Sequence, residues 1–437
     1  MKKTFSKGGV HPAANKIASR DILLQPLPTL ACVPLAQHIG APAIAIVCKG
    51  DKVTRGEQIA RAASFVSAPL HAPISGTVQG VDNVLMPNGK PSQAIIIKAT
   101  DEEHEADTIS REKYWAELPV AKIPSHLPAD EIRRMISEAG IVGLGGATFP
   151  SHVKLSLKPE QKPEILIING CECEPYLMCD DALMCKWPRM IVEGVALMMQ
   201  AGGIPRAVIS LEDNKPEAAA AIASALGSRN DITLQILRTK YPQGGEKQLI
   251  EAVTGRRIAS GALPISVGAV VHNVATAFAV WQAIATGQPL IERVVTVTGD
   301  IPAEERTNYL AAVGTPFSEF PFTLPDEAKV IVGGPMMGRT AVNLDAPVTK
   351  GTSGLVILRE TRRRPVQACI RCGACVDACP MGLEPYLLSA YGRLRMFDDA
   401  READVADCLE CGACSYNCPS ARPLLDYIRI AKQRSRK

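Results

Sequence analysis

Eight of the fourteen cysteines form two copies of one pattern near the C-terminal end of the chain. Each copy reads Cys-x2-Cys-x2-Cys-x3-Cys-Pro, and the cysteines are Cys369, Cys372, Cys375, Cys379 and Cys408, Cys411, Cys414, Cys418. This spacing is typical of iron–sulfur proteins, because three close thiolates wrap one corner of a cube and a fourth comes from elsewhere. We therefore predict two [4Fe-4S] clusters, each of which carries one electron at a time.

The repeat resembles ferredoxins with two clusters, in which the fourth cysteine of each run binds the other cluster. The resemblance implies the following ligand sets: Cys369, Cys372, Cys375 and Cys418 for cluster 1, and Cys379, Cys408, Cys411 and Cys414 for cluster 2. Gly373 and Gly412 allow the backbone to turn tightly and to aim N–H groups at the sulfurs. The alternatives are structural zinc and disulfides. A zinc site needs only four thiolates, so it does not explain why the chain has two runs of four cysteines, each followed by a proline.

A second informative stretch is rich in glycine and runs from residue 143 to residue 154. Gly143, Gly145 and Gly146 let backbone N–H groups approach a phosphate, and Lys154 supplies positive charge. Thr148 stands where the dinucleotide-binding fingerprint has its third glycine, so the stretch does not match that fingerprint.

Carboxylates follow a buried strand predicted at residues 164–168, and ligands of α/β proteins bind at the carboxyl ends of strands. Glu172, Glu174, Asp180 and Asp181 are thus either part of a nucleotide site or a solvated acidic edge. Four more cysteines lie here, namely Cys171, Cys173, Cys179 and Cys185. Their spacing fits no familiar metal site, so we favour small buried thiols over a third metal centre.

Together with segments 241–247 and 271–276, these motifs resemble the flavin- and NADH-binding subunit of respiratory complex I. The resemblance implies FMN contacts at Gly145, Gly146, Lys154, Asn169, Asn273 and Thr276. It also implies that Phe149 and Glu174 face NADH, with Glu246 nearby. Cys171 replaces the aspartate of that family, which puts a cofactor contact at this position in doubt.

Size and composition limit the function classes. A chain of 437 residues corresponds to about three domains of roughly 150 residues each. The formal net charge of +3 does not suggest bulk nucleic-acid binding. No apolar run approaches the length of a membrane-spanning helix, and the N-terminus has no apolar segment of a secretory signal. Cluster thiolates indicate a reducing compartment.

The elements that position these motifs are predicted in chain order. Residues 1–30 are expected to be a loop that wraps the first domain. Residues 31–107 alternate short β-branched runs with turns, resemble a barrel-sandwich (lipoyl-like) module, and end in a charged linker at 101–107. The hairpin tip at 62–68 has no lysine, so no cofactor is attached there, and His71 is expected to be structural. A capped helix is predicted at 128–140.

The remaining boundaries follow the resemblances: an FMN/NADH-binding α/β domain at 108–288, a β-grasp domain at 289–360 and the two-cluster module at 361–437. The fold class is therefore multidomain α/β and α+β. This order, with the motifs at 8–12 and 37–42, resembles the family of C subunits of the Rnf (Rsx) electron transport complex. The resemblance covers essentially the whole chain.

That family implies a peripheral subunit without a transmembrane segment, at the cytoplasmic face of the bacterial inner membrane. It would exchange electrons between NADH and the other subunits of an ion-translocating complex, with ferredoxin at the other end. FMN belongs between NADH and the clusters, because it accepts an electron pair and releases single electrons. The alternatives are a microcompartment-type cobalamin reductase and a non-catalytic subunit that only carries clusters.

Overall fold

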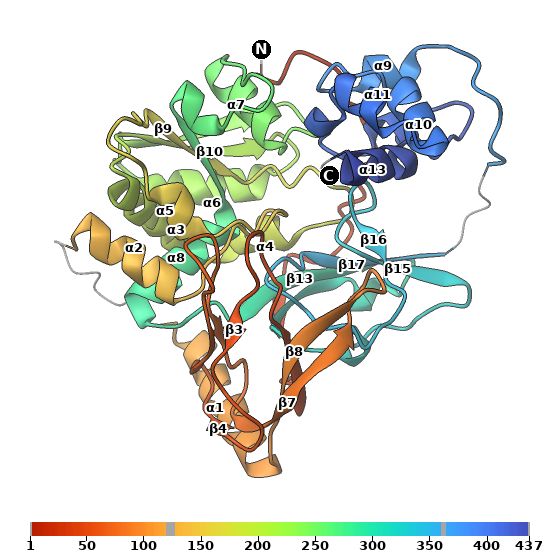
Figure 1. Cartoon of the computed structure of the whole chain (residues 1–437). Helices are drawn as coiled ribbons and strands as arrows, with labels where there is room; N and C mark the ends of the chain where they lie inside the picture. Colours follow the sequence, from red (N-terminus) through yellow and green to blue (C-terminus); the bar gives the residue numbers. More distant parts are fainter. Residues whose placement is uncertain (1, 119–126, 360–363, 436–437) are drawn as a thin grey trace.

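The computed structural model describes residues 2–118, 127–359 and 364–435. Figure 1 shows four parts: a β module that ends in a narrow tip, an α/β domain, a mixed sheet beside it, and a small helical module formed by the C-terminal residues. Helix α13 (Leu424–Arg434) of this module lies close to strand β16 (Arg339–Thr340) of the mixed sheet.

The N-terminal β module consists of two small sheets. One has the strand order β2 (Leu30–Pro34), β8 (Pro91–Lys98), β7 (Gly76–Leu85) and β4 (Lys52–Val53). The other pairs β3 (Ile44–Ala45), β5 (Gln58–Arg61) and β6 (Leu70–His71). Their apolar faces enclose a core that includes Ile59, Ile95 and Ile97, all fully buried. This arrangement confirms the β-rich module.

The segment predicted as a charged linker at 101–107 is instead the start of helix α1 (Asp101–Ala116), so that prediction was wrong. Thr100 and Glu103 form a capping box, in which each side chain accepts a hydrogen bond from the backbone of the other. Arg111 of this helix is buried and donates to Glu292 and to the carbonyl oxygens of Gln25 and Leu310. The helix thereby joins the β module to the mixed sheet.

The α/β domain has a parallel sheet with the order β11 (Ile232–Leu237), β10 (Ala207–Glu212), β9 (Ile165–Asn169) and β12 (Ala269–Asn273). One face packs against α2 (Ala129–Glu138), α5 (Pro188–Gly202), α6 (Pro216–Leu226) and α8 (Val274–Thr286). The other packs against α7 (Glu246–Thr254). Helix α2 confirms the helix predicted at 128–140. The chain leaves β9 toward β10 and returns on the other side as β12. Folds of this kind bind ligands outside the carboxyl ends of the two strands where the direction changes, and we refer to this place, at the ends of β9 and β12, as the crevice.

The mixed sheet has the order β1 (Ile22–Leu24), β14 (Thr307–Ala312), β13 (Glu292–Gly299), β17 (Gly354–Arg359), β15 (Ala328–Val332) and β16 (Arg339–Thr340). Strand β1 belongs to the segment predicted as a loop around the first domain. The segment is mostly irregular, as predicted, but Ile22–Leu24 form an edge strand of the mixed sheet instead of lying on the first domain. The segment pairs with β14, bridges from Lys3 to Leu237, and donates from Gly9 to the carbonyl of Ala378. It therefore ties three parts of the molecule together.

The C-terminal module contains α9 (Ala374–Ala378), α10 (Pro385–Leu394), α11 (Phe397–Glu402), α12 (Ala413–Tyr416) and α13 (Leu424–Arg434). Helices α10 and α13 pack closely where Gly392 meets the carbonyl of Tyr427, a contact that leaves no room for a side chain at position 392. Leu388, Leu424 and Ile428 fill the small core around the cysteines. None of the helices in the described ranges is both long and apolar enough to cross a membrane.

Candidate functional site

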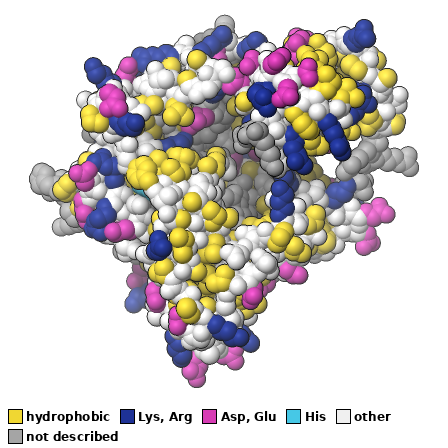
Figure 2. Space-filling model, in the orientation of Figure 1, with side chains coloured by type: hydrophobic (Ala, Val, Ile, Leu, Met, Phe, Trp, Pro, Cys, Tyr) yellow, Lys and Arg dark blue, Asp and Glu magenta, His cyan; other side chains and the backbone are white. Residues whose placement is uncertain are grey.

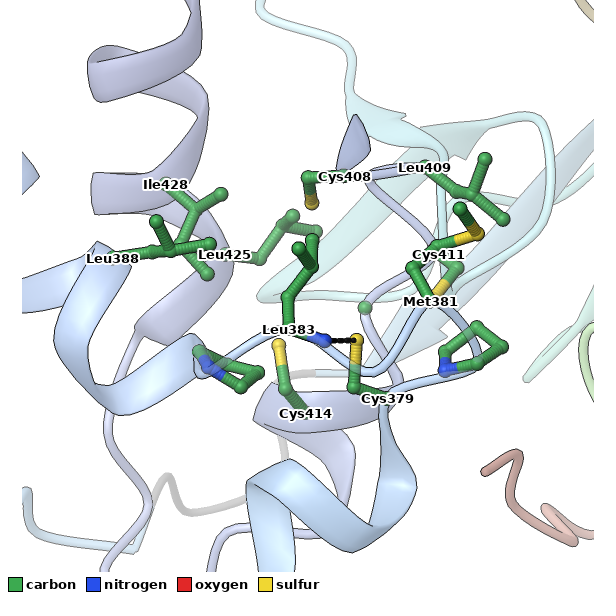
Figure 3. Close-up of a pocket in the computed structure, with 13 residues that line it drawn as sticks. Cys379, Met381, Leu383, Leu388, Cys408, Leu409, Cys411, Cys414, Leu425 and Ile428 are labelled. Carbon is green, nitrogen blue, oxygen red and sulfur yellow. Dashed lines mark hydrogen bonds between the residues drawn. The ribbon is translucent and has the colours of Figure 1, made fainter. Parts of the chain in front are cut away.

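Four of the predicted ligands, Cys379, Cys408, Cys411 and Cys414, line one cavity in the C-terminal module (Figure 3). Leu388, Leu425 and Ile428 form an apolar wall of the same cavity. The backbone N–H of Leu383 donates to the sulfur of Cys379 at 3.4 Å, and that of Glu410 donates to the sulfur of Cys408 at 3.4 Å. The structure thus brings together the four residues of cluster 2 from both halves of the repeat.

The surroundings of these thiols fit an iron–sulfur cluster. Burial raises the pKa of Cys411 to about 12 and that of Cys414 to about 12, so uncompensated thiolates are unstable here. Bound iron supplies the positive charge that keeps such sulfurs deprotonated. The apolar wall and the N–H donors are the features that tune cluster potentials.

The cysteines of cluster 1 lie closer to the surface. Cys375 and Cys418 belong to the same core, and the neighbouring Cys418 adds to the burial that raises the pKa of Cys375. Cys369 and Cys372 are exposed. Ser420 holds the segment before them, because it accepts from Gln367 N–H and donates to the carbonyl of Ala368. The cluster 1 set is therefore half enclosed, whereas the cluster 2 set is largely buried.

Both cysteine runs use the same backbone conformation. Gly373 and Gly412 have φ of +77°, and each immediately precedes a short helix. A Cβ atom at Gly412 would lie 2.7 Å from the carbonyl oxygen of Met336, so a side chain does not fit there. The expected tight turns are confirmed, and the second one packs directly on the turn at 333–338.

The crevice of the parallel sheet is flanked by two asparagines. Asn169 ends β9 and Asn273 ends β12, opposite each other in register. The Asn273 amide donates to Asp180 at 2.6 Å, and its oxygen accepts from Ala275 N–H and caps α8. The Asn169 amide donates to the carbonyl of Gly244 at 2.9 Å. These two predicted FMN contacts thus lie side by side at the strand ends, where α/β folds bind ligands.

The glycine-rich loop folds over the start of α8. The Gly143 N–H donates to the carbonyl of Phe149 at 2.8 Å and closes the loop, and the Leu144 N–H donates to the hydroxyl of Thr276 at 2.9 Å. Gly145 packs on Asn273, and Gly146 has φ of +129° with open space on its side-chain side. An exposed glycine backbone above a helix N-terminus fits the phosphate of FMN.

Lys154 lies on α3 (Ser151–Leu155) and reaches across the end of the sheet. Its ammonium group donates to Glu246 at 2.7 Å and to the carbonyl of Val271 at 3.2 Å. Glu246 is the first residue of α7, so the pair joins the two segments that border the crevice. Phe149 is half-buried at the end of the glycine-rich loop.

Glu174 lies at the junction of three parts of the molecule. Its carboxylate accepts from the backbone N–H of Met336 at 3.0 Å and of Met337 at 2.8 Å, both in the turn at 333–338. Burial raises the pKa of this carboxyl group. Tyr241 lies beside it and donates its hydroxyl to the carbonyl of Cys411 at 2.7 Å. The contact of Glu174 with NADH stays a prediction.

The other acidic residues are not a solvated edge. Glu172 is buried and accepts from Asp180 N–H at 2.7 Å, which places its charge at the start of α4 (Cys179–Lys186). Asp181 is buried and pairs with Arg20 at 2.7 Å. Burial raises the pKa of Asp180 to about 7.

Sequence reasoning missed Lys16, which organises this turn. Its ammonium group donates to the carbonyls of Glu172, Glu174 and Leu177 at 2.8, 2.9 and 2.5 Å. Lys16 comes more than 150 residues earlier, in a segment expected to lie elsewhere, so no local pattern indicated the contact.

The four additional cysteines do not gather around one point. Cys171 donates to the carbonyl of Ser210, and Cys173 accepts from Gly244 N–H at 3.4 Å. Among the described residues, one group has three potential metal-binding atoms close together, and it consists of Glu172, Cys179 and Asp180. Of the four additional cysteines, this group therefore contains Cys179 alone, and the arrangement does not indicate a third metal centre built from all four.

Three family models match consecutive parts of the chain. Residues 3–103 match the RnfC barrel sandwich hybrid domain, residues 136–282 match the Nuo51 FMN-binding domain, and residues 362–419 match a 4Fe-4S dicluster domain. The predicted fold class and the two kinds of cofactor domain are confirmed.

Curated relatives match over most of their length. The C subunit of the proton-translocating ferredoxin:NAD(+) oxidoreductase complex of Clostridium ljungdahlii is 42% identical, covering 100% of this chain and 95% of the relative. The C subunit of the Na(+)-translocating ferredoxin:NAD(+) oxidoreductase complex of Acetobacterium woodii is 41% identical, covering 98% of this chain and 96% of the relative. The C subunit of the ion-translocating oxidoreductase complex of Rhodobacter capsulatus is 40% identical, covering 89% of this chain and 75% of the relative.

Among solved structures, an NAD+-reducing [NiFe]-hydrogenase in the air-oxidized state is similar with a TM-score of 0.50 and 21% identity, covering 79% of this chain and 74% of that chain. This likeness concerns the fold alone. The sequence relatives carry the conclusion, because they match the chain over nearly its whole length: the chain belongs to the family of C subunits of the ion-translocating ferredoxin:NAD+ oxidoreductase (Rnf) complexes.

Proposed function

We propose that this chain exchanges electrons between NADH or NAD+ and the rest of an ion-translocating membrane complex. FMN in the crevice and two [4Fe-4S] clusters in the C-terminal module would carry the electrons, with ferredoxin as the reaction partner at the other end of the complex. The chain would sit peripherally at the cytoplasmic face of the inner membrane. The family membership and the two cofactor domains support this proposal.

The observation that carries the proposal is the contact between the crevice and the cluster 2 cavity. Tyr241 belongs to the segment that leads into α7 beside the crevice, and its hydroxyl binds the backbone of Cys411. Lys247 of α7 pairs with Asp407, next to Cys408, at 3.5 Å. A relay needs fixed short distances between its carriers, and these contacts fix the two parts against each other.

The residues proposed for each role follow the earlier expectations. The residues that would hold FMN are the predicted ones, namely Gly145, Gly146, Lys154, Asn169, Asn273 and Thr276. FMN supplies the step between two-electron and one-electron transfer when it is bound. Phe149 and Glu174, with Glu246 nearby, position NADH so that its nicotinamide ring lies against the flavin.

The test is a measurement of iron, acid-labile sulfide and flavin on anaerobically purified chain, followed by NADH oxidation with an artificial acceptor. We expect about eight iron and one FMN per chain, with turnover. Clusters without FMN and without turnover would instead identify a subunit that only carries clusters. Reduction of cobalamin by the same preparation would favour the cobalamin reductase.

A further inference from the structure

An exposed aromatic ring lies at the edge of the flavin crevice and comes from the N-terminal β module. Phe65 belongs to the hairpin tip at 62–68, and 61% of it is exposed. Figure 2 shows apolar side chains gathered at the end of this module that faces the α/β domain, next to a hollow in the centre of the molecule. Ile39 is also exposed and lies in the turn between β2 and β3, which forms a second tip beside the first. Large apolar side chains grouped in this way indicate a binding surface.

The tip is fastened to the glycine-rich loop by direct contacts. His152, three residues after Phe149, donates from Nε2 to the carbonyl of Phe65 at 3.0 Å. The two rings pack edge to face, with centroids 5.5 Å apart. The Ile39 N–H points to the carbonyl of Thr148 at 3.4 Å. Both tips therefore end at the segment that closes the proposed FMN loop.

The two tips are also hydrogen-bonded to each other. The N–H of Ala41 donates to the carbonyl of Val66 at 3.2 Å, and the hydroxyl of Ser67 donates to the carbonyl of Ala41 at 2.9 Å. The N–H of Ala68 donates to the ring of His38 at 3.1 Å. These hydrogen bonds fix the backbone that carries Phe65 before any ligand binds. Little conformational entropy is therefore lost when a ligand stacks on the Phe65 ring.

These contacts indicate which part of a dinucleotide reaches Phe65. Hydride transfer requires the nicotinamide ring to lie on the flavin, inside the crevice. The other aromatic ring of NADH is adenine, which then extends toward the rim. We propose that Phe65 forms the outer wall of the NADH site and stacks on the adenine ring. The inference rests on the proposed function and extends it, because it assigns substrate recognition to the β module that carries no cofactor of its own.

The experiment compares Phe65→Ala with the parent chain, both loaded with FMN and clusters, using NADH and the adenine-free substrate reduced nicotinamide mononucleotide. Loss of one stacking contact should raise KM for NADH about 10-fold. The kcat should stay unchanged, since stacking contributes equally to the ground state and the transition state. KM for the mononucleotide should not change. Calorimetric titration with NAD+ gives the same comparison without turnover.

Two variants serve as controls. Phe65→Tyr keeps the ring and should restore the parent KM, whereas Leu85→Ala removes an exposed apolar side chain at the end of β7 and should have no effect. An equal rise in KM for NADH and for the mononucleotide, or no rise in KM for either substrate, would overturn the inference. In the second case the tip would be a surface for another subunit. Absence of NADH turnover in the parent chain would instead contradict the proposed function.

Discussion

The hydroxyl of Tyr241 donates a hydrogen bond of 2.7 Å to the carbonyl oxygen of Cys411, across the boundary between the α/β domain and the cluster module. Tyr241 is 2% exposed and Cys411 is buried, so no water replaces this bond when one partner is lost. The contact therefore stabilises the interface that would separate FMN from cluster 2 in the proposed relay.

Replacement of Tyr241 by Phe should weaken this interface. An unsatisfied buried carbonyl costs about 1–3 kcal/mol, so we expect a lower midpoint of thermal unfolding. Iron and FMN contents should stay at the parent level, because neither set of proposed ligands is changed. The matched control is Tyr416→Phe, at a tyrosine that is 50% exposed. An unfolding midpoint equal to that of the parent would show that the bond does not stabilise the interface.

Replacement of Cys408 by Ser should remove cluster 2 alone. The iron content is expected to fall from about eight to about four per chain, since each cubane holds four iron atoms. Cys48→Ser is the control, because Cys48 is exposed in the N-terminal module and should not alter the iron content. Retention of all the iron in the Cys408 variant would refute the ligand set.

Replacement of Gly145 by Val should abolish FMN binding and leave the clusters intact. A Cβ atom at position 145 would lie 3.1 Å from Cβ of Asn273, and a valine side chain adds two methyl groups in this space. At Gly143 a Cβ atom would meet its nearest neighbour at an ordinary 3.6 Å, so Gly143→Ala should keep the flavin. Extracted flavin per chain is the measurement, and equal flavin in both variants would exclude the proposed cradle.

Lys350 should make stability depend on pH. It is fully buried and donates to the carbonyls of Pro69 and Gly140 at 2.9 and 2.6 Å. Burial lowers its pKa to about 7, whereas a lysine in the unfolded chain has a pKa of about 10.4. Between these values the unfolded chain binds more protons, so the free energy of unfolding should rise from about pH 7 to pH 10.

The measurement is the unfolding midpoint at pH 7 and at pH 9. The parent chain should gain more stability over this interval than Lys350→Met, which has no proton to release. Lys90→Met at an exposed position should behave like the parent. Identical pH profiles for the parent and the Lys350 variant would contradict the lowered pKa.

The sequence alone determined the features that are local in the chain. The cysteine spacing predicted two clusters, because a cubane requires sulfurs at fixed separations along a short segment. The density of glycines at 143–146 predicted a phosphate-binding loop, because few other residues permit such close approach of the backbone to a ligand. The capping box of Thr100 and Glu103 is also a local pattern, and it indicates a helix. Our interpretation of residues 101–107 as a charged linker did not take it into account.

Only the tertiary structure decided which distant residues meet. Lys16 binds the turn at 172–177, Tyr241 binds Cys411, and Phe65 contacts His152 on α3, shortly after the glycine-rich loop. These partners are separated by many residues, and their contacts depend on how the four parts of the molecule pack together. No local pattern of residues encodes which surfaces come into contact.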